Sequence, residues 1–261
     1  MARLCAAPSP AGQKQGEHLL AVYDPDLGTV LAQRKVGDKT NEIPLARELL
    51  AELDLQHTIV TADAMHTQTA FCEQVLAQGG DYLLTVKKNQ PNLLAEISYL
   101  FATEQAGSQG VDFVSSVATN KGHGRVETRR LTSSTMLNGY TQWPGLSQVY
   151  KIERVCWRLD GSLLREETGY GVTSLARKYG TPARLSGWLR GHWNIENGLH
   201  YRRDKTLLED QCRQKPQHAG QTLAVLNNVV VGLVGKRNLA AARREYAARP
   251  YKALQLLTSN L

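Results

Sequence analysis

The chain has 261 residues, 42% of them hydrophobic, and a formal net charge of +7. This length and composition suffice for a full core in one large domain, with or without an insertion, and they exclude wholesale disorder. The charge is uneven, because thirteen Lys and Arg face five Asp and Glu from residue 181 onward, a local balance of +8. A basic C-terminal third is typical of proteins with a polyanionic partner such as nucleic acid, although solubility alone would also explain it.

The cysteines and apolar runs are typical of a protein of the reducing cytoplasm. The four cysteines form no CxxC pair, which favours neither a zinc site nor a disulfide framework. The longest apolar run, Val225 to Val234, is broken by Asn227 and Asn228 and is too short to span a membrane. Residues 1–17 lack the apolar core of a signal peptide and are predicted to form a flexible leader.

The first predicted elements are a β-hairpin and a helix. Short apolar or alternating runs at His18–Tyr23 and Thr29–Val36 flank the turn Asp24–Gly28, which is the pattern of a hairpin. An amphipathic helix is predicted from Asn41 to Leu53.

Two buried strands linked by helices come next. The strands are predicted at Thr58–Ala62 and Asp81–Val86, and the helices at about Thr67–Ala77 and from Pro91 to Glu104. Helix-linked buried strands are typical of an α/β layer with parallel pairing at its centre. Because working residues gather beyond the carboxyl ends of such strands, Asp63 and Lys87 become candidate site residues.

A β-rich insertion interrupts this α/β pattern. Antiparallel strands are predicted at Val111–Val117, Gly124–Leu131, Gln148–Leu159 and Glu166–Val172. The predicted organisation is therefore an α/β part at 18–110, the insertion at 111–175, helices at 176–236 that complete the α/β domain, and a basic helical tail at 237–261.

The stretch Gly187–Asp210 contains no proline and is predicted to form one long helix. Its core-facing stripe consists of Leu185, Trp188, His192, Ile195 and Leu199. Glu196 lies beside this stripe among basic side chains, so it is either a carboxylate in a surface ion pair or one directed at a metal ion. Trp188 and Trp193 are expected in the core rather than at a base-stacking surface.

Asp63 also has two interpretations. An aspartate at the end of a strand often caps the following helix through its side chain. A catalytic role requires a second carboxylate, and Glu196 is the best candidate for it. Together the two would hold divalent metal ions through oxygen ligands.

Two basic clusters are candidate phosphate contacts. Lys87 and Lys88 follow a predicted strand, and the segment Lys121–Arg130 (KGHGRVETRR) places His123 between two glycines and close to several arginines. Both clusters are equally compatible with ordinary polar surface. As DNA contacts, the second cluster offers the cations Lys121, Arg125, Arg129 and Arg130, with His123 near metal or phosphate.

Five blocks occur in order along the chain: KTNEIP (Lys39–Pro44), VTADAMHTQ (Val60–Gln68), GGDYLLTVKKNQP (Gly79–Pro91), KGHGRVETRR (Lys121–Arg130) and HWNIENGLHYRRD (His192–Asp204). This ordered set resembles the DDE transposases of bacterial insertion sequences, and most closely their H-repeat-associated subgroup. The resemblance extends over nearly the whole chain, from His18 to about Asn228.

The resemblance implies an α/β, RNase H-like fold: a mixed central sheet flanked by helices, with the β-rich insertion before the last catalytic helix. It implies two-metal cleavage and strand transfer of DNA with Mg²⁺ or Mn²⁺. Asp63 matches the second acid of the family's triad and Glu196 the third. The wider group's Tyr–Arg–Glu–Lys pattern is filled here by Leu189, His192, Glu196 and Arg203, so only the glutamate is retained and Arg203 is a conservative cation.

The family's first acid has no counterpart in this sequence. That acid lies in an Asp-Gly-Lys at the end of the first strand, and the segment from Ala2 onward resembles the loop on the C-terminal side of that motif. The first strand and an N-terminal DNA-binding region are therefore expected to be missing. Gly37-Asp38-Lys39 is no substitute because it comes after the hairpin, and an absent first acid is expected to weaken metal binding.

The sequence thus predicts a transposase impaired by truncation, with a non-catalytic DNA-binding remnant as the alternative. An α/β enzyme with a small-molecule substrate has no motif in its favour. Expected partners are the double-stranded DNA of transposon ends and a second copy of the chain on that DNA. The expected DNA contacts are Lys87, Lys88, Lys121, His123, Arg125, Arg129, His200 and Arg203.

Overall fold

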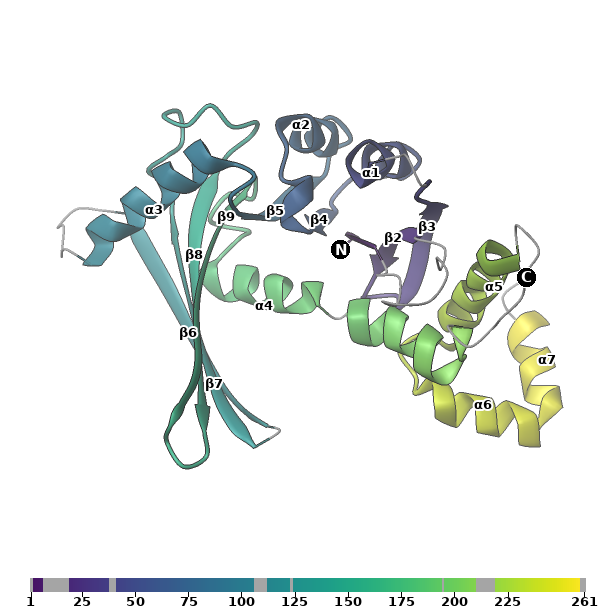
Figure 1. The fold of residues 1–261 in the computed structure, drawn as a ribbon. Coiled ribbons are helices and arrows are strands. Elements are labelled where there is room, and N and C mark those ends of the chain that lie inside the picture. Colours follow the sequence, from purple (N-terminus) through teal and green to yellow (C-terminus); the bar gives the residue numbers. More distant parts are fainter. Residues whose placement is uncertain are drawn as a thin grey trace. The chain divides into compact units, whose positions relative to one another are not determined.

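The computed structural model describes residues 2–6, 19–37, 41–105, 112–122, 124–193, 195–209 and 219–258, with the backbone alone at 2–6, 104–105, 196–197 and 219. The chain forms two compact units (Figure 1). The first unit combines Met1–Leu53 with Trp193–Leu261, and the second unit is Asp54–His192. This division differs from the predicted one, because the insertion continues the sheet of the α/β part instead of standing apart from it.

The second unit is built on a mixed sheet of six strands in the order β4-β5-β9-β8-β7-β6. The strands are β4 (Ile59–Ala62), β5 (Asp81–Val86), β6 (Phe113–Gly122), β7 (Arg125–Ser134), β8 (Gln148–Arg158) and β9 (Leu163–Thr173). β4 and β5 are parallel, and all the other pairings are antiparallel. The predicted mixed sheet, its parallel pair of helix-linked strands and its β-rich part are confirmed, but the parallel pair lies at one edge of the six strands and not at their centre.

Helices cover both faces of this sheet. They are α2 (Thr69–Ala77), α3 (Pro91–Gln105) and α4 (Pro182–His192). On one face, Phe101 of α3 packs against the rings of Phe113 and Tyr170. On the other face, Leu185 and Leu189 of α4 join a core cluster with strand residues from β5, β7 and β8. The predicted helices flanking the sheet are therefore confirmed.

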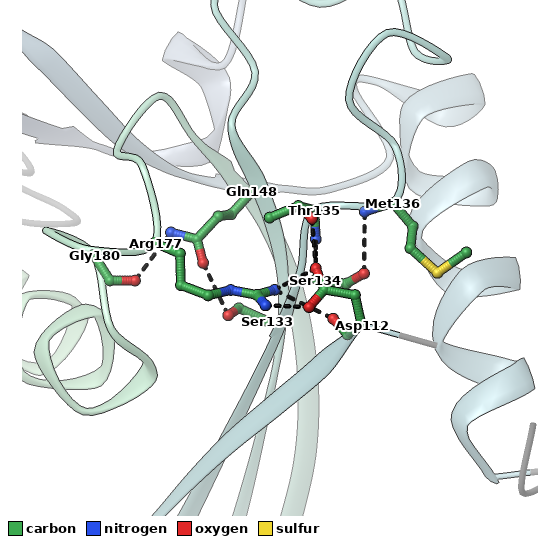
Figure 2. Close-up of polar contacts among 8 residues, drawn as sticks. All are labelled: Asp112, Ser133, Ser134, Thr135, Met136, Gln148, Arg177 and Gly180. Carbon is green, nitrogen blue, oxygen red and sulfur yellow. Dashed lines mark hydrogen bonds and ion pairs between the residues drawn. The ribbon is translucent and has the colours of Figure 1, made fainter. Parts of the chain in front are cut away.

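A polar cluster, buried at Gln148 and partly exposed at Asp112 and Arg177, holds the connection before α4 against the ends of β6, β7 and β8 (Figure 2). Arg177 donates two hydrogen bonds to the carboxylate of Asp112, and its guanidinium lowers the pKa of that carboxyl to about 2. Gln148 donates to the carbonyls of Leu175 (2.8 Å) and Gly180 (2.9 Å), and it accepts from Ser133 (3.0 Å). Buried side-chain hydrogen bonds of this kind make the start of α4 a fixed point on the sheet.

Gly171 in β9 leaves room for a neighbouring tyrosine ring. Tyr150, opposite Gly171, donates its hydroxyl hydrogen bond to the Leu84 carbonyl (3.0 Å) across that gap. A Cβ on Gly171 would lie 2.2 Å from the Tyr150 ring and 2.3 Å from the Leu84 carbonyl oxygen. We therefore expect Gly171→Ala to lower the free energy of unfolding by about 3 kcal/mol through overpacking.

The matched control for this substitution lies two residues away in the same strand. A Cβ on Gly169 would meet only the Ile152 Cγ2 at 3.3 Å. Gly169→Ala should therefore lower the free energy of unfolding, measured in urea, by less than about 1 kcal/mol. Equal losses for the two variants would contradict the close packing of Tyr150 over Gly171.

The first unit contains the sheet β3-β2-β1. Its strands are β1 (Ala2–Ala6), β2 (Leu19–Asp24) and β3 (Thr29–Lys35), all paired antiparallel. The predicted hairpin is confirmed, and Gly28 closes its turn with a φ of +74°, which glycine adopts without strain. The predicted leader is wrong at its start, because Ala2–Ala6 forms a strand; the short sequence ARLCA has no β-branched residue to signal one.

The helices of the first unit are α1 (Glu42–Ala51), α5 (Ala219–Val234), α6 (Leu239–Ala248) and α7 (Pro250–Thr258). Asn41 caps α1 by accepting a hydrogen bond from the Ile43 backbone N–H (3.1 Å). Pro250 begins α7, so the predicted interruption of the basic tail is confirmed. In the described ranges, no helix combines the length and apolar character that crossing a membrane requires.

The prediction of one long helix over Gly187–Asp210 is wrong. Helix α4 ends at His192, and the chain continues as two π-helical turns, Glu196–His200 and Arg202–Thr206. The apolar stripe is real, but its two halves enter two cores: Leu185 and Leu189 pack in the second unit, whereas Ile195 and Leu199 pack in the first. Spacing alone cannot show such a change of core.

The two tryptophans of this stretch differ in burial. Trp188 packs against the core cluster of the second unit, as predicted. Trp193, immediately after α4, is 53% exposed, so its predicted core position is wrong. It comes after the last residue of the helix, where the apolar periodicity of α4 no longer applies.

Candidate active site

Asp63 directly follows β4, at the carboxyl end of a buried strand. It precedes the short turn Ala64–His66, yet its side chain makes no capping hydrogen bond, and the next helix, α2, begins after Gln68. The helix-cap interpretation of Asp63 is therefore wrong. Its side chain is 44% exposed, which leaves the carboxylate accessible to a ligand.

His192, the last residue of α4, lies against Asp63. Its Nε2 is 3.5 Å from Asp63 Oδ1, and its Nδ1 is 3.0 Å from the hydroxyl of Thr61 in β4. A neutral imidazole that donates from Nε2 must accept at Nδ1, so the Thr61 hydroxyl then donates. The buried pair Thr61 and His192 thereby directs an N–H toward the carboxylate of Asp63.

Hydrogen bonds join the loop after β4 to the loop after β5. Asn89 donates to the Ala64 carbonyl (2.8 Å), and Gln90 donates to the Thr67 carbonyl (2.9 Å). Thr67 in turn donates to the carbonyl of Thr85 in β5 (2.8 Å). These bonds keep Lys87, the first residue after β5, in the neighbourhood of Asp63.

The surroundings of Asp63 favour its ionised form. The hydrogen bond from His192 contributes most to lowering the pKa of Asp63, and partial burial acts in the opposite direction. Electrostatic attraction by His192, His66 and Lys87 lowers the pKa further. Asp63 is therefore a carboxylate at neutral pH, with acceptor oxygens only.

His66 makes the stability of this region depend on pH. Burial lowers the pKa of His66 from 6.5 to about 4, while the carboxylate of Asp63 opposes that change. Between these values the unfolded chain binds more protons, so the stability contributed above pH 6.5 is lost as the pH falls toward 4. The shift corresponds to about 3 kcal/mol at most. We expect His66→Gln to flatten the decline in unfolding free energy from pH 7 to 4.5, measured by urea titration.

The control for this prediction is His57→Gln, which removes an exposed histidine from the same unit. That variant should keep the wild-type decline. Parallel pH profiles for wild type and His66→Gln would contradict the neutral, buried state of His66.

Comparison with known proteins places the chain in a family. The profile of the transposase DDE domain matches residues 5–227, which is most of the chain. The chain belongs to the transposase DDE domain family. The resemblance to DDE transposases of the H-repeat group is thereby confirmed.

Relatives of this DDE domain agree with the assignment. YbfL and YhhI of Escherichia coli K12, the second named as an H repeat-associated transposase, are each 28% identical over 251 residues, or 88% of this chain. A protein from the dhlA 3′ region of Xanthobacter autotrophicus is 36% identical over 141 residues, covering 52% of this chain and 46% of its own. The match with this chain spans 64% of the length of YbfL and of YhhI.

Among solved structures, a piggyBac transposase in a synaptic complex with hairpin DNA aligns with 92% of this chain and 47% of its own. Its identity is 11% and the TM-score is 0.45.

Two predicted DNA contacts of the DDE domain are buried in the first unit. Arg203 is 4% exposed; it donates to both carboxylate oxygens of Glu209 and to Gln33 Oε1 (3.1 Å). Asn227 donates to the same glutamate (2.7 Å). His200 is buried as well. Because Arg203 is buried and its guanidinium is hydrogen-bonded within the protein, it cannot contact a DNA phosphate in this structure. The burial of His200 argues against its predicted DNA contact in the same way.

The other predicted DNA contacts differ in accessibility. Lys87, Lys88, Lys121 and Arg125 are exposed. Arg129 is mostly buried, with 12% of its side chain exposed, and it is ion-paired with Glu127 (2.5 Å). His123 lies outside the described residues.

Glu196 begins the first π-helical turn, and its side chain lies outside the part of the chain that the structure describes. Asp63 and Glu196 belong to different units, so their pairing stays a prediction. Over the described residues, no group of three or more His, Cys, Asp or Glu side chains could hold a metal ion. Sequence reasoning missed Thr61 and His66; the period of two that places Thr61 and Asp63 on one side of a strand was the available signal for Thr61.

Proposed function

We propose that this chain is the catalytic domain of an insertion-sequence transposase with an RNase H-like fold. It would cleave double-stranded DNA at transposon ends and join strands by metal-dependent phosphodiester chemistry. The observation that supports this most is the ionised, accessible carboxylate of Asp63 at the carboxyl end of β4. That position is where ligands bind in α/β sheets.

The donor chemistry at Asp63 suits Mg²⁺ or Mn²⁺. Oδ1 faces His192, whereas Oδ2 has no hydrogen-bond partner among the residues with described side chains, so one carboxylate oxygen is open to a cation. Hard divalent cations prefer such oxygen ligands. When bound, a pair of these ions would activate water and stabilise the leaving oxygen of a phosphodiester.

Glu196 is proposed as the second metal ligand. It lies four residues after His192, and His192 lies against Asp63. Four residues of extended chain span at most about 14 Å, which keeps the Glu196 backbone within reach of the Asp63 neighbourhood. The π-helical turn that starts at Glu196 supports the same role, because π-turns are frequent at functional sites.

Neighbouring side chains would position the reactants. His192, fixed by Thr61, would orient the Asp63 carboxylate. Lys87 and Lys88, exposed at the end of β5, would contact DNA phosphates beside the site. A second copy of the chain on the paired DNA ends is part of the proposal.

The test is incubation with terminal-repeat DNA and Mg²⁺ or Mn²⁺. Metal-dependent cleavage by the wild type that disappears in Asp63→Asn and in Glu196→Gln would support the proposal. Salt-sensitive DNA binding without any cleavage would overturn it. That result would favour a second candidate, a DNA-binding remnant.

A further inference from the structure

Five arginines share one face of the strands β7, β8 and β9, and we call this set the arginine face: Arg125, Arg129, Arg154, Arg158 and Arg165. The register decides the face. Arg125 lies opposite Arg158, and Arg129 lies opposite Arg154. Arg165 lies opposite Cys156, which is two residues from each of the β8 arginines. Since side chains alternate along a strand, all five point to the same side of the sheet.

This side is the one that carries α4. Arg190 of α4 donates to Asn120 Oδ1 (3.3 Å), and Asn120 lies opposite Glu127, in step with the arginines of β7. Leu131, four residues after Glu127, packs with Leu189 of α4. In Figure 1 the long strands β6 to β9 extend well past α4, so no described helix of the second unit covers the outer part of this side.

The two faces of these strands differ in charge. The arginine face carries two carboxylates, Glu127 and Glu167, against its five arginines. The opposite face carries Lys121, Arg130 and Lys151 against Glu153 and Glu166, so it is close to balanced. An external anion would therefore be attracted to the arginine face.

The cross-strand pairing on the arginine face is unfavourable for the sheet itself. Like charges directly opposite each other destabilise a sheet, and Arg125–Arg158 and Arg129–Arg154 are two such pairs. The opposite face shows the favourable alternative, because Arg130 lies opposite Glu153.

The carboxylates of the arginine face do not neutralise it. Glu127 pairs with Arg129 and Glu167 with Arg165. Among the described residues, the exposed Arg125 pairs with no carboxylate, and the guanidinium of the exposed Arg158 donates only to Ser162. Guanidinium donors thus remain for a partner.

We propose that the arginine face is a docking surface for the phosphate backbone of duplex DNA. Naming DNA as the anion rests on the proposed function. Guanidinium groups match phosphate oxygens in a bidentate manner, and same-face residues two apart stand about 6.8 Å from each other on a strand. The aromatic side chain that these strands place on the same side, Tyr150, is fully buried, so the arginine face binds without base stacking and without sequence preference.

The test is binding of the full chain to a random-sequence duplex, measured by fluorescence anisotropy over a salt series. We expect the double variant Arg125→Gln/Arg158→Gln to weaken binding about 10-fold or more at low salt. The plot of the logarithm of the binding constant against the logarithm of the salt concentration should become less steep by about 2. The matched control on the opposite face, Lys121→Gln/Arg130→Gln, should change affinity less than about 2-fold. The loss should be equal for random and transposon-end duplexes.

A second measurement separates docking from a structural role. Because Arg125→Gln removes one member of a like-charge pair, we expect the melting temperature to rise by about 1–2 °C while DNA affinity falls. A lower melting temperature, or equal affinity losses from both faces, would overturn the inference. So would acidic polyglutamate binding as tightly as DNA.

The outcomes also separate this inference from the proposed function. DNA binding that is unchanged by the arginine-face variants would overturn the inference alone. A wild-type chain that binds no duplex would overturn both.

Discussion

Substitution of Asp63 by asparagine should weaken Mn²⁺ binding at least about 10-fold and reduce metal-dependent cleavage by about 100-fold or more. The substitution removes the negative charge that His192, His66 and Lys87 stabilise, and it leaves the amide isosteric with the carboxylate. Metal affinity is measured by calorimetry or by the loss of the free Mn²⁺ electron paramagnetic resonance signal. Those measurements report on the site even where no cleavage is detected.

The control is Glu73→Gln, an exposed carboxylate on α2 of the same unit. It should leave Mn²⁺ affinity within about 2-fold, because exposed carboxylates far from other ligands bind divalent ions weakly. Equal affinities for Asp63→Asn and wild type would remove Asp63 from the metal site. DNA binding should survive Asp63→Asn, since phosphate contacts come from cationic side chains.

The second large effect concerns stability, and it arises from the ion pair of the buried Arg203 with the mostly buried Glu209. Arg203→Met should lower the free energy of unfolding by about 3–5 kcal/mol, because it leaves the Glu209 carboxylate without its guanidinium. Gln33 would lose a donor as well. Urea unfolding of the full chain measures the change, with the midpoint and slope compared to wild type.

Two further variants make this prediction specific. Arg203→Met/Glu209→Gln should recover part of the loss, because the uncompensated charge is gone. Arg244→Met, on the exposed side of α6 in the same unit, should cost less than about 0.5 kcal/mol. A small stability loss for Arg203→Met combined with a large loss of DNA affinity would restore Arg203 as a phosphate contact.

Most elements of the fold can be predicted from local patterns. Local patterns predict the hairpin of β2 and β3, the buried strands β4 and β5, and helix α5. In each element the hydrophobic residues follow one pattern, and turn or polar residues mark its ends. Strand β1 is not predictable, since its five residues lack β-branched side chains. The end of α4 at His192 is not predictable either, because buried residues continue at helical spacing into a different core.

In the candidate site, too, local sequence predicts single residues but not the contacts between residues far apart in the chain. Asp63 is predictable from its place after a buried strand, because that end of an α/β sheet is where sites form. The contact between Thr61 and His192 joins residues 131 positions apart, and nothing in either local sequence indicates it. Arg203 is a comparable case, since one of its partners, Gln33, lies 170 positions away.

The pairing register of the strands decides which arginines share the arginine face. The sequence KGHGRVETRR shows Arg125, Arg129 and Arg130 as one basic cluster. Strand alternation places Arg130 on the opposite face, where it meets Glu153, and pairing with β8 brings Arg154 and Arg158 to the side of Arg125. Sequence alone therefore identifies the cations but not the surface that they form.

The central claim is that Asp63 and Glu196 hold a divalent metal ion together, and an anomalous-difference map from crystals grown with Mn²⁺ tests it most directly. The predicted result is a peak at about 2.0–2.6 Å from a carboxylate oxygen of each residue, the range for hard cations with oxygen ligands. A map with no peak at Asp63, or a structure with the two carboxyl groups more than about 10 Å apart, would contradict the claim, because paired metal ions lie only about 4 Å from each other.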